Sequence, residues 1–283
     1  MAFERRRILI TGAGGFIGSA LLKRLCDLSP VAVYYNTKPR LEYRSLRFVD
    51  LCDEHAVRVL MKEVRPEIVY HFAALTSPQR NENDPELSRE SHLNITENVV
   101  NNLPEGAHIV FTSTDKVFDG SDPYPNENSE PRPLWLYARL KLECENLIRK
   151  RVPRHHIVRL GIVHSLGEEQ AYMRQSEVKS IIDNAIVNMR MGKKAEIFNN
   201  VERCYVRISR LVDLFNCLLD DEHYGLYHVG SPKMSYYERI KQLCMEIGIA
   251  WQDLLVPVSG TATPMVQNLN TVKYSSTFRI IFD

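Results

Sequence analysis

The chain has 283 residues, of which 44% are hydrophobic and 25% are charged, ordinary values for a globular protein with a buried core. Its 36 basic and 35 acidic side chains leave a net charge of +1, which gives no reason to expect nucleic acid or a membrane surface as a partner. No apolar stretch approaches the roughly 20 residues that cross a bilayer, and the first residues do not resemble a signal peptide, so the sequence predicts a cytoplasmic protein.

The first half of the chain alternates short apolar runs with amphipathic stretches. The runs predict six strands, at residues 7–11, 31–35, 47–50, 67–72, 107–112 and 156–160. The stretches between them predict helices at residues 16–26, 53–64, 85–103 and 134–151. Continuous apolar strands separated by helices are typical of a parallel sheet covered on both faces. Right-handed crossovers then favour a doubly wound Rossmann sheet of the α/β class.

The second half of the chain is less regular. It predicts helices at residues 209–219 and 235–247, and its tail from Trp251 onward is rich in Pro, Thr, Ser and Asn. We interpret this half as two further strands of the sheet and a smaller C-terminal lobe that binds substrate. The predicted dinucleotide-binding domain is residues 1–165, with a contribution from 204–230. The predicted lobe is residues 166–203 and 231–283.

A glycine-rich run, TGAGGFIG at residues 11–18, lies between the first strand and the first helix. Gly12 would permit a tight turn, Gly15 would let the backbone approach a pyrophosphate, and Gly18 would let the helix pack closely on the strand. The helix start at Phe16 and Ile17 would then offer free N–H groups to the diphosphate. An ordinary glycine-rich turn is the alternative, but the flanking strand and helix favour a dinucleotide site.

The end of the second predicted strand indicates which dinucleotide binds. An NAD site would usually have an acidic residue there to hold the ribose 2′-hydroxyl. This chain instead has Asn36, Thr37, Lys38 and Arg40, whose donors and cations suit the 2′-phosphate of NADP. The alternative is a solvated basic loop without ligand contact. NADP is therefore the predicted cofactor, with NAD as the second choice.

Tyr137 and Lys141 stand four residues apart, which places a phenol and an ammonium on one face of a helix. A tyrosine needs a nearby cation to lower its pKa before it can work as an acid–base group near neutral pH. The same spacing occurs at two other places in the chain, so spacing alone decides little. Only this pair opens the helix after the fifth strand, whose end carries Thr114 and Asp115 at the edge where ligands bind in open α/β sheets.

In their order along the chain, these motifs resemble the extended short-chain dehydrogenase/reductases, a family of nucleotide-sugar epimerases, dehydratases and reductases. The resemblance spans nearly the whole length and includes Asp50 and Leu51 after the third strand and the run HFAA at residues 71–74. Within the family, STDKVFDG at residues 113–120 and NLNTVK at residues 268–273 are similar to the dTDP-4-dehydrorhamnose reductase subgroup.

The resemblance implies three catalytic residues. Thr114 would hydrogen-bond the substrate carbonyl, Tyr137 would donate a proton to it, and Lys141 would lower the phenol pKa and hold the nicotinamide ribose. It also implies the rest of the cofactor path. Asp50 and Leu51 would border the adenine, and the path toward the nicotinamide would be lined by Ala73, Ala74 and Leu75.

On the substrate side the resemblance implies roles for Thr114, Asp115 and Arg203, the last as a clamp on the nucleotide diphosphate. Solvation at the surface is the alternative for Arg203. Two positions depart from the family pattern. Lys116 replaces the glutamate of dehydratases and the usual tyrosine of the reductases, and Ile162 stands where reductases have a tryptophan that contacts substrate. The departures argue against dehydration and leave the sugar open.

The leading hypothesis is an NADPH-dependent reductase of a nucleotide-linked keto sugar. The alternatives are a nucleotide-sugar 4-epimerase with bound NAD and a non-catalytic, NADP-binding regulatory subunit. The six cysteines are scattered without a CxxC pair, so no metal site is expected. Family members often dimerise through helices that correspond to residues 85–103 and 134–151, which suggests a homodimer.

Overall fold

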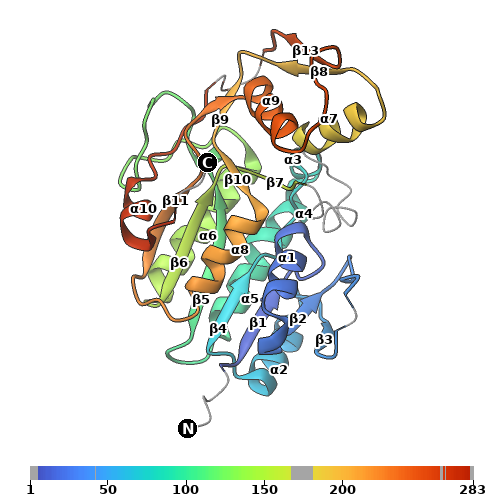
Figure 1. Cartoon of the computed structure of the whole chain (residues 1–283). Helices are drawn as coiled ribbons and strands as arrows, with labels where there is room; N and C mark the ends of the chain where they lie inside the picture. Colours follow the sequence, from blue (N-terminus) through green and yellow to red (C-terminus); the bar gives the residue numbers. More distant parts are fainter. Residues whose placement is uncertain (1–5, 42, 167–180, 262–263, 265, 281–283) are drawn as a thin grey trace.

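Seven parallel strands form the central sheet of the computed structural model, which describes residues 6–41, 43–166, 181–261, 264 and 266–280 (Figure 1). From edge to edge the order is β11 (Gly225–Val229), β6 (His155–Leu160), β5 (His108–Thr114), β4 (Ile68–His71), β1 (Ile8–Thr11), β2 (Val31–Tyr34) and β3 (Leu46–Phe48). The predicted α/β fold with a Rossmann-like parallel sheet is confirmed. The chain runs outward in both directions from the β1–β4 pair, so the carboxyl ends of these two strands form the switch point of the sheet.

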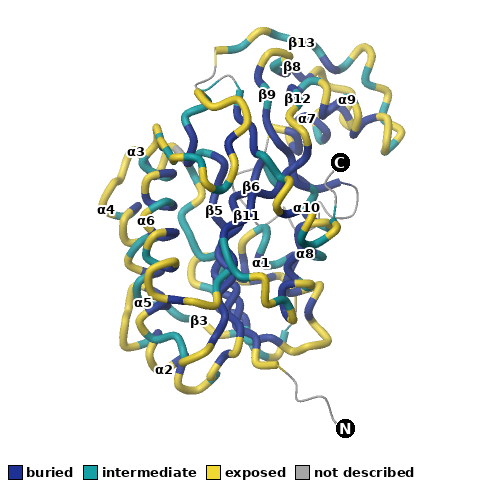
Figure 2. The backbone as a smooth tube through the Cα atoms, turned by 90° about the vertical axis from the view of Figure 1, so that its left-hand side faces the viewer, coloured by how far each residue is buried: buried dark blue, intermediate teal, exposed yellow. Residues whose placement is uncertain are grey.

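Helices cover both faces of this sheet (Figure 2). One face packs on α1 (Phe16–Arg24) and α8 (Ile208–Cys217), and the other packs on α2 (Glu54–Val64), α5 (Ile95–Asn101) and α6 (Leu136–Arg151). Alternation along each strand divides the core: Ile8 and Ile10 face the α1 side, whereas Leu9 faces the α2 side. Apolar residues therefore run without interruption along β1, because both of its faces are buried.

The helix predicted at residues 85–103 is interrupted. The structure has α4 (Pro85–Arg89), a π-helical turn η2 (Glu90–Asn94) and then α5, preceded by a short helix α3 (Pro78–Asn83) that the sequence did not predict. A π-turn adds about one residue to a helical turn and rotates every later side chain. Here it buries the His92 ring, whose Nε2 lies 2.9 Å from the carbonyl oxygen of Leu75.

The smaller lobe has its own apolar core, at the top of Figure 1. Its elements are α7 (Ile181–Arg190), β8 (Ala195–Phe198), α9 (Tyr236–Glu246) and β13 (Leu255–Val258). Two short ribbons adjoin it: β7 (Ile162–His164) pairs with β10 (Tyr205–Arg207), and β9 (Glu202–Arg203) pairs with β12 (Met234–Ser235). Two single turns, η1 (Cys26–Leu28) and η3 (Asp115–Val117), follow α1 and β5.

Two expectations for the second half are wrong. Only β11 joins the central sheet there among the described residues, since β10 pairs with β7 instead. Residues 272–278, which were expected in the lobe, form a helix that the sequence did not predict, α10 (Val272–Phe278), which packs on β11 and buries Tyr274 in the core of the main sheet. Elsewhere the division of the chain into domain and lobe stays a prediction. Residues 167–180, within the predicted lobe segment 166–203, lie outside the described residues.

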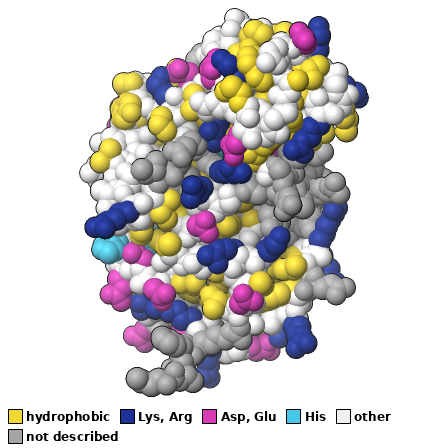
Figure 3. Space-filling model, viewed as in Figure 1, with side chains coloured by type: hydrophobic (Ala, Val, Ile, Leu, Met, Phe, Trp, Pro, Cys, Tyr) yellow, Lys and Arg dark blue, Asp and Glu magenta, His cyan; other side chains and the backbone are white. Residues whose placement is uncertain are grey.

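The surface carries both signs of charge. Figure 3 shows basic and acidic side chains interspersed over the face seen in Figure 1, as expected for a net charge near zero. No helix in the described part of the chain is long and apolar enough to span a bilayer.

Candidate active site

The glycine-rich turn connects β1 to α1, and three of its glycines have no room for a side chain. Gly12 has φ +66°, and a Cβ there would lie 2.6 Å from the backbone nitrogen of Ala73. A Cβ on Gly18 would lie 2.2 Å from the carbonyl oxygen of Gly12, so helix and turn touch directly. A Cβ on Gly14 would lie 1.7 Å from the carbonyl oxygen of Thr37, a role that the sequence did not indicate.

Gly15 differs from these neighbours because it is exposed and its Cβ position meets only one atom, at 3.2 Å. It is the N-cap of α1 and makes no side-chain cap, so the N–H groups of the first helical turn at Phe16 and Ile17 are available to a ligand. The turn stands at the switch point of the sheet. These are the properties of a diphosphate cradle, and the residues present fit a dinucleotide.

The basic loop after β2 lies against this turn through the contact of Thr37 with Gly14. Asn36, Lys38 and Arg40 are exposed on the same loop, within the segment predicted to bind the 2′-phosphate. After β3, Leu51 is buried and the carboxylate of Asp50 accepts a hydrogen bond from the Cys52 N–H at 2.8 Å. After β4, three partly buried residues border the turn or follow it: Ala73, Ala74 and Leu75.

Tyr137 is the second residue of α6, and its helix start is fixed by a neighbouring helix. Glu82 of α3 accepts a hydrogen bond from the Leu136 N–H at 2.7 Å and so satisfies a free donor of the first turn. The Tyr137 ring meets the His92 ring edge-on, with centroids 5.4 Å apart. Burial raises the pKa of the Tyr137 phenol well above its usual value, and the Asp115 carboxylate raises it further.

Lys141 is buried one helical turn later. Its ammonium donates a hydrogen bond to the Thr112 carbonyl at 2.9 Å and lies 4.5 Å from the centroid of the Phe111 ring. Burial lowers the pKa of Lys141 to about 8. Burial and Asp115 raise the pKa of Tyr137, and the expected lowering of the phenol pKa by Lys141 is not seen in this structure, so the phenol keeps its proton near neutral pH.

Thr114 ends β5 and Asp115 follows it, close to Tyr137. The Thr114 hydroxyl donates to the Asp115 carboxylate at 3.2 Å and accepts from the Lys116 N–H at 3.2 Å. Asp115 is buried, and the loss of hydration raises its pKa, although the Lys116 and Arg203 charges oppose this rise.

A cavity of about 240 Å³ joins most of the predicted substrate residues. Its lining consists of Asp115, Lys116, Trp135, Tyr137, Ile162, Arg203, Tyr236 and Gln267. Arg203 is buried there, and its guanidinium donates to the carbonyls of Glu202 and Pro264 at 2.7 and 2.9 Å. The surface alternative for Arg203 is therefore wrong. Asp115, Tyr137, Ile162 and Arg203, widely separated in the sequence, face one space.

Three lining residues were not predicted: Trp135, Tyr236 and Gln267. Trp135 stands two residues before Tyr137, and its place just ahead of the helix that begins with Leu136 and Tyr137 was the available signal. Tyr236 opens α9 of the lobe and has no motif. The Gln267 amide donates to the carbonyls of Asp115 and Phe118 at 3.1 and 3.3 Å, so it holds the segment after β5 from a distant part of the chain.

Comparison with known proteins shows which family and which fold the chain shares. The profile of the family described as RmlD substrate binding domain matches residues 6–268. The chain is 30% identical to methionine adenosyltransferase 2 subunit beta of Xenopus tropicalis over 82% of its own length and 70% of that protein. It is 25% identical to dTDP-4-dehydrorhamnose reductase of Salmonella typhimurium, over 97% and 92% of the two chains.

Among solved structures, the dTDP-4-dehydrorhamnose reductase of Bacillus anthracis in complex with NADP superposes with a TM-score of 0.81. The superposition covers all of this chain and 95% of the reductase chain, at 22% sequence identity. At this identity the likeness concerns the fold.

Proposed function

The chain belongs to the RmlD substrate binding domain family, and on that premise we propose that it is an NADPH-dependent reductase of a nucleotide-linked keto sugar. The observation that carries the proposal is the cavity in which Tyr137, Asp115 and Arg203 meet, with Thr114 and Lys141 beside it. A phenol donor, a hydroxyl donor and a buried guanidinium are the groups that reduction of a diphosphate-linked ketone requires.

The residues divide the work between proton transfer and binding. The neutral Tyr137 hydroxyl would donate its proton to the ketone oxygen, which Thr114 would hold by a hydrogen bond. The buried Lys141 ammonium would bind the ribose hydroxyls of the dinucleotide and keep positive charge near the reacting oxygen. When bound, the nicotinamide supplies the hydride.

The specific cofactor proposed is NADP. The exposed Asn36, Lys38 and Arg40 follow β2 without an acidic residue among residues 36–40, and the cradle at Gly12, Gly15 and Gly18 suits the diphosphate.

The test is the consumption of NADPH and NADH, followed by absorbance, with a panel of 4-keto nucleotide sugars. We expect NADPH oxidation with at least one sugar, and a loss of about a hundredfold or more in Tyr137→Phe with unchanged NADPH affinity. Sugar interconversion without net NADPH loss would instead identify an epimerase. No reaction with any sugar, despite tight NADPH binding, would contradict catalysis.

A regulatory subunit is a second candidate, favoured by the 30% identity to methionine adenosyltransferase 2 subunit beta. In this case the chain would bind NADP and associate with a methionine adenosyltransferase. Copurification of the two proteins, and a change in adenosyltransferase activity that persists in Tyr137→Phe, would support this function over the reductase.

The homodimer is a further proposal, since α5 and α6 pack side by side on one face of the sheet. Sedimentation equilibrium tests it: the mass of one chain would contradict it.

A further inference from the structure

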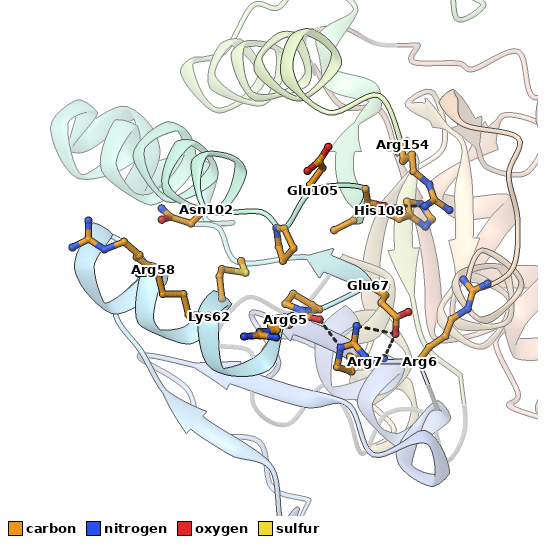
Figure 4. Close-up of a pocket in the computed structure, with 15 residues that line it drawn as sticks. Arg6, Arg7, Arg58, Lys62, Arg65, Glu67, Asn102, Glu105, His108 and Arg154 are labelled. Carbon is orange, nitrogen blue, oxygen red and sulfur yellow. Dashed lines mark hydrogen bonds and ion pairs between the residues drawn. The ribbon is translucent and has the colours of Figure 1, made fainter. Parts of the chain in front are cut away.

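A second cavity lies at the amino ends of β1, β4 and β5, at the edge of the sheet opposite to the glycine-rich turn (Figure 4). Its volume is about 830 Å³, within the range of roughly 300–1,000 Å³ that small-molecule sites occupy. Six basic side chains line this basal cavity: Arg6, Arg7, Arg58, Lys62, Arg65 and Arg154. Only two carboxylates, Glu67 and Glu105, line it with them.

Most of this positive charge is not neutralised by the protein. Arg6 pairs with Asp220 at 3.1 Å and Arg7 pairs with Glu67 at 3.7 Å. The other four cations form no ion pair with a carboxylate of the described residues. Burial lowers the pKa of the His108 side chain to about 3, so this lining residue is uncharged near neutral pH. The basal cavity is therefore strongly cationic in a protein whose net charge is +1.

Two of the guanidinium groups are held in place by neutral partners. Arg7 donates from Nε to the Arg65 carbonyl at 2.7 Å, as drawn in Figure 4. Arg154 donates to the Gly106 carbonyl at 2.9 Å and to the Tyr224 hydroxyl at 2.8 Å. The partners of Arg154 fix its guanidinium without cancelling its charge, so it remains available to an anion at little further cost in side-chain entropy, whereas Arg7 also pairs with Glu67.

A helix dipole explains only part of this arrangement. Lys62 lies in the last turn of α2, where a cation offsets the partial negative charge of the helix end. Arg7 and Arg154 instead precede β1 and β6, so no helix end accounts for them. Cations from separate elements line one concavity, whose lining also includes Met61, Pro66, Pro104 and Ala107.

We propose that the basal cavity binds a small molecule with a polyphosphate chain, of the class of nucleoside triphosphates. Guanidinium groups bind phosphate oxygens bidentately, and a triphosphate carries enough charge to engage several of them together. Among the apolar lining residues, the partly exposed Pro104 offers surface to the base. The proposal is independent of the reductase function, since this cavity shares no residue with the candidate active site.

The test is calorimetric titration of the whole protein with inorganic tripolyphosphate and with ATP, at low ionic strength, with and without saturating NADPH. We expect one site that NADPH does not compete for, because the dinucleotide turn lies at the other edge of the sheet. The variant Lys62→Glu/Arg65→Asn should bind tripolyphosphate with about one tenth of the wild-type affinity or less. Its affinity for NADPH should be unchanged. Asparagine suits position 65, whose φ is +45°.

The matched control is Lys193→Glu/Lys194→Asn, which makes the same change of charge at exposed residues outside the basal cavity. Its affinity for tripolyphosphate should equal that of the wild type. If the double variant fails to fold, the single variant Lys62→Gln is measured in its place. Its affinity for tripolyphosphate should be severalfold lower than that of the wild type. Equal losses in variant and control, or no binding of either ligand at about 1 mM, would overturn the proposal. Binding of an acidic peptide but of neither phosphate compound would also overturn it and identify a protein partner instead.

Discussion

Gly14 and Gly15 are adjacent in the turn but meet different surroundings. We expect Gly14→Ala to destabilise the protein by about 1–3 kcal/mol, because its methyl group would overlap the Thr37 carbonyl. We expect Gly15→Ala to melt close to the wild type, since its φ of −75° suits alanine and its surroundings are open. The same change should weaken NADPH binding, because the methyl group would face the diphosphate.

Thermal unfolding and NADPH titration of the two variants check this pair. Each serves as the control for the other, since the substitution is identical and the positions are adjacent. Unchanged NADPH affinity in Gly15→Ala would contradict a diphosphate at this turn.

Lys141 provides a pH-dependent test of the same site. Its pKa is lowered to about 8 by burial, so its ammonium is charged below that pH and loses its charge above it. NADPH affinity should therefore fall by about tenfold between about pH 7 and pH 9. In Lys141→Met the affinity should be low and independent of pH over this range. Fluorescence titration across the range measures both, and a flat profile in the wild-type protein would remove Lys141 from the dinucleotide site.

The glycine turn and the Tyr137/Lys141 pair were predictable because each depends on residues close together in the sequence. Gly14, Tyr236 and Gln267 were not, because their partners are distant in the chain and become neighbours only in the fold. The pKa of the Tyr137 phenol is raised by burial and by Asp115. Neither effect can be inferred from the spacing between Tyr137 and Lys141.

Among helices and strands, the central elements were predictable because apolar runs of four to six residues mark buried parallel strands. The interrupted helix at residues 85–101 was not, since inserting a π-turn leaves the amphipathic composition almost unchanged. The short α10 was also missed, because its polar sequence VKYSSTF buries only Tyr274.

Four elements are joined behind the active site by one buried ion pair. Arg159 of β6 donates to Glu145 of α6 at 2.7 and 3.0 Å, and both side chains are almost fully buried. Ser113 of β5 also donates to Glu145, and Arg159 lies 3.4 Å from a ring nitrogen of His228 on β11. The pair therefore ties the strand that carries Thr114 to the helix that carries Lys141.

We expect Arg159→Met to lower the free energy of unfolding by about 3–5 kcal/mol, because it leaves the Glu145 carboxylate buried without its partner. The double variant Arg159→Met/Glu145→Met should recover part of that loss. As a control, Arg24→Met breaks an exposed pair with Asp213 and should cost about 1 kcal/mol or less. Urea unfolding gives all three values. A double variant no more stable than Arg159→Met would contradict the coupling.

For the protein as a whole, sequence periodicity predicted the main sheet, whereas the lobe depended on contacts that no local pattern specifies. Its strands β8 and β13 pair across roughly 60 residues of chain, and β13 contains Pro257, which argues locally against a strand. Arg203 and Tyr236 of the lobe line the candidate site, so the part of the fold least visible in the sequence supplies part of that site.

Six buried histidines predict how the whole protein responds to acid. Burial lowers their pKa values from 6.5 to about 4 for His156 and to about 3 for the others, which are His71, His92, His108, His164 and His228. As the pH falls through 6.5 the unfolded chain binds protons that the folded protein does not, so stability is lost progressively from there toward pH 3. Each histidine removes about 1.4 kcal/mol per pH unit within that window, and the raised pKa of Asp115 acts in the opposite direction.

Urea unfolding at about pH 7.5, 6.5 and 5.5 measures this loss, which should steepen below 6.5. His164→Leu removes one buried imidazole, so the slope of the unfolding free energy against pH should fall by the equivalent of about one proton. His55→Gln, at an exposed position, serves as the control. An unchanged slope in His164→Leu, or equal stability at the three pH values, would contradict the assignment of acid sensitivity to the buried histidines. The expected slope thus ties the acid sensitivity of the intact fold to histidine side chains that folding removes from water.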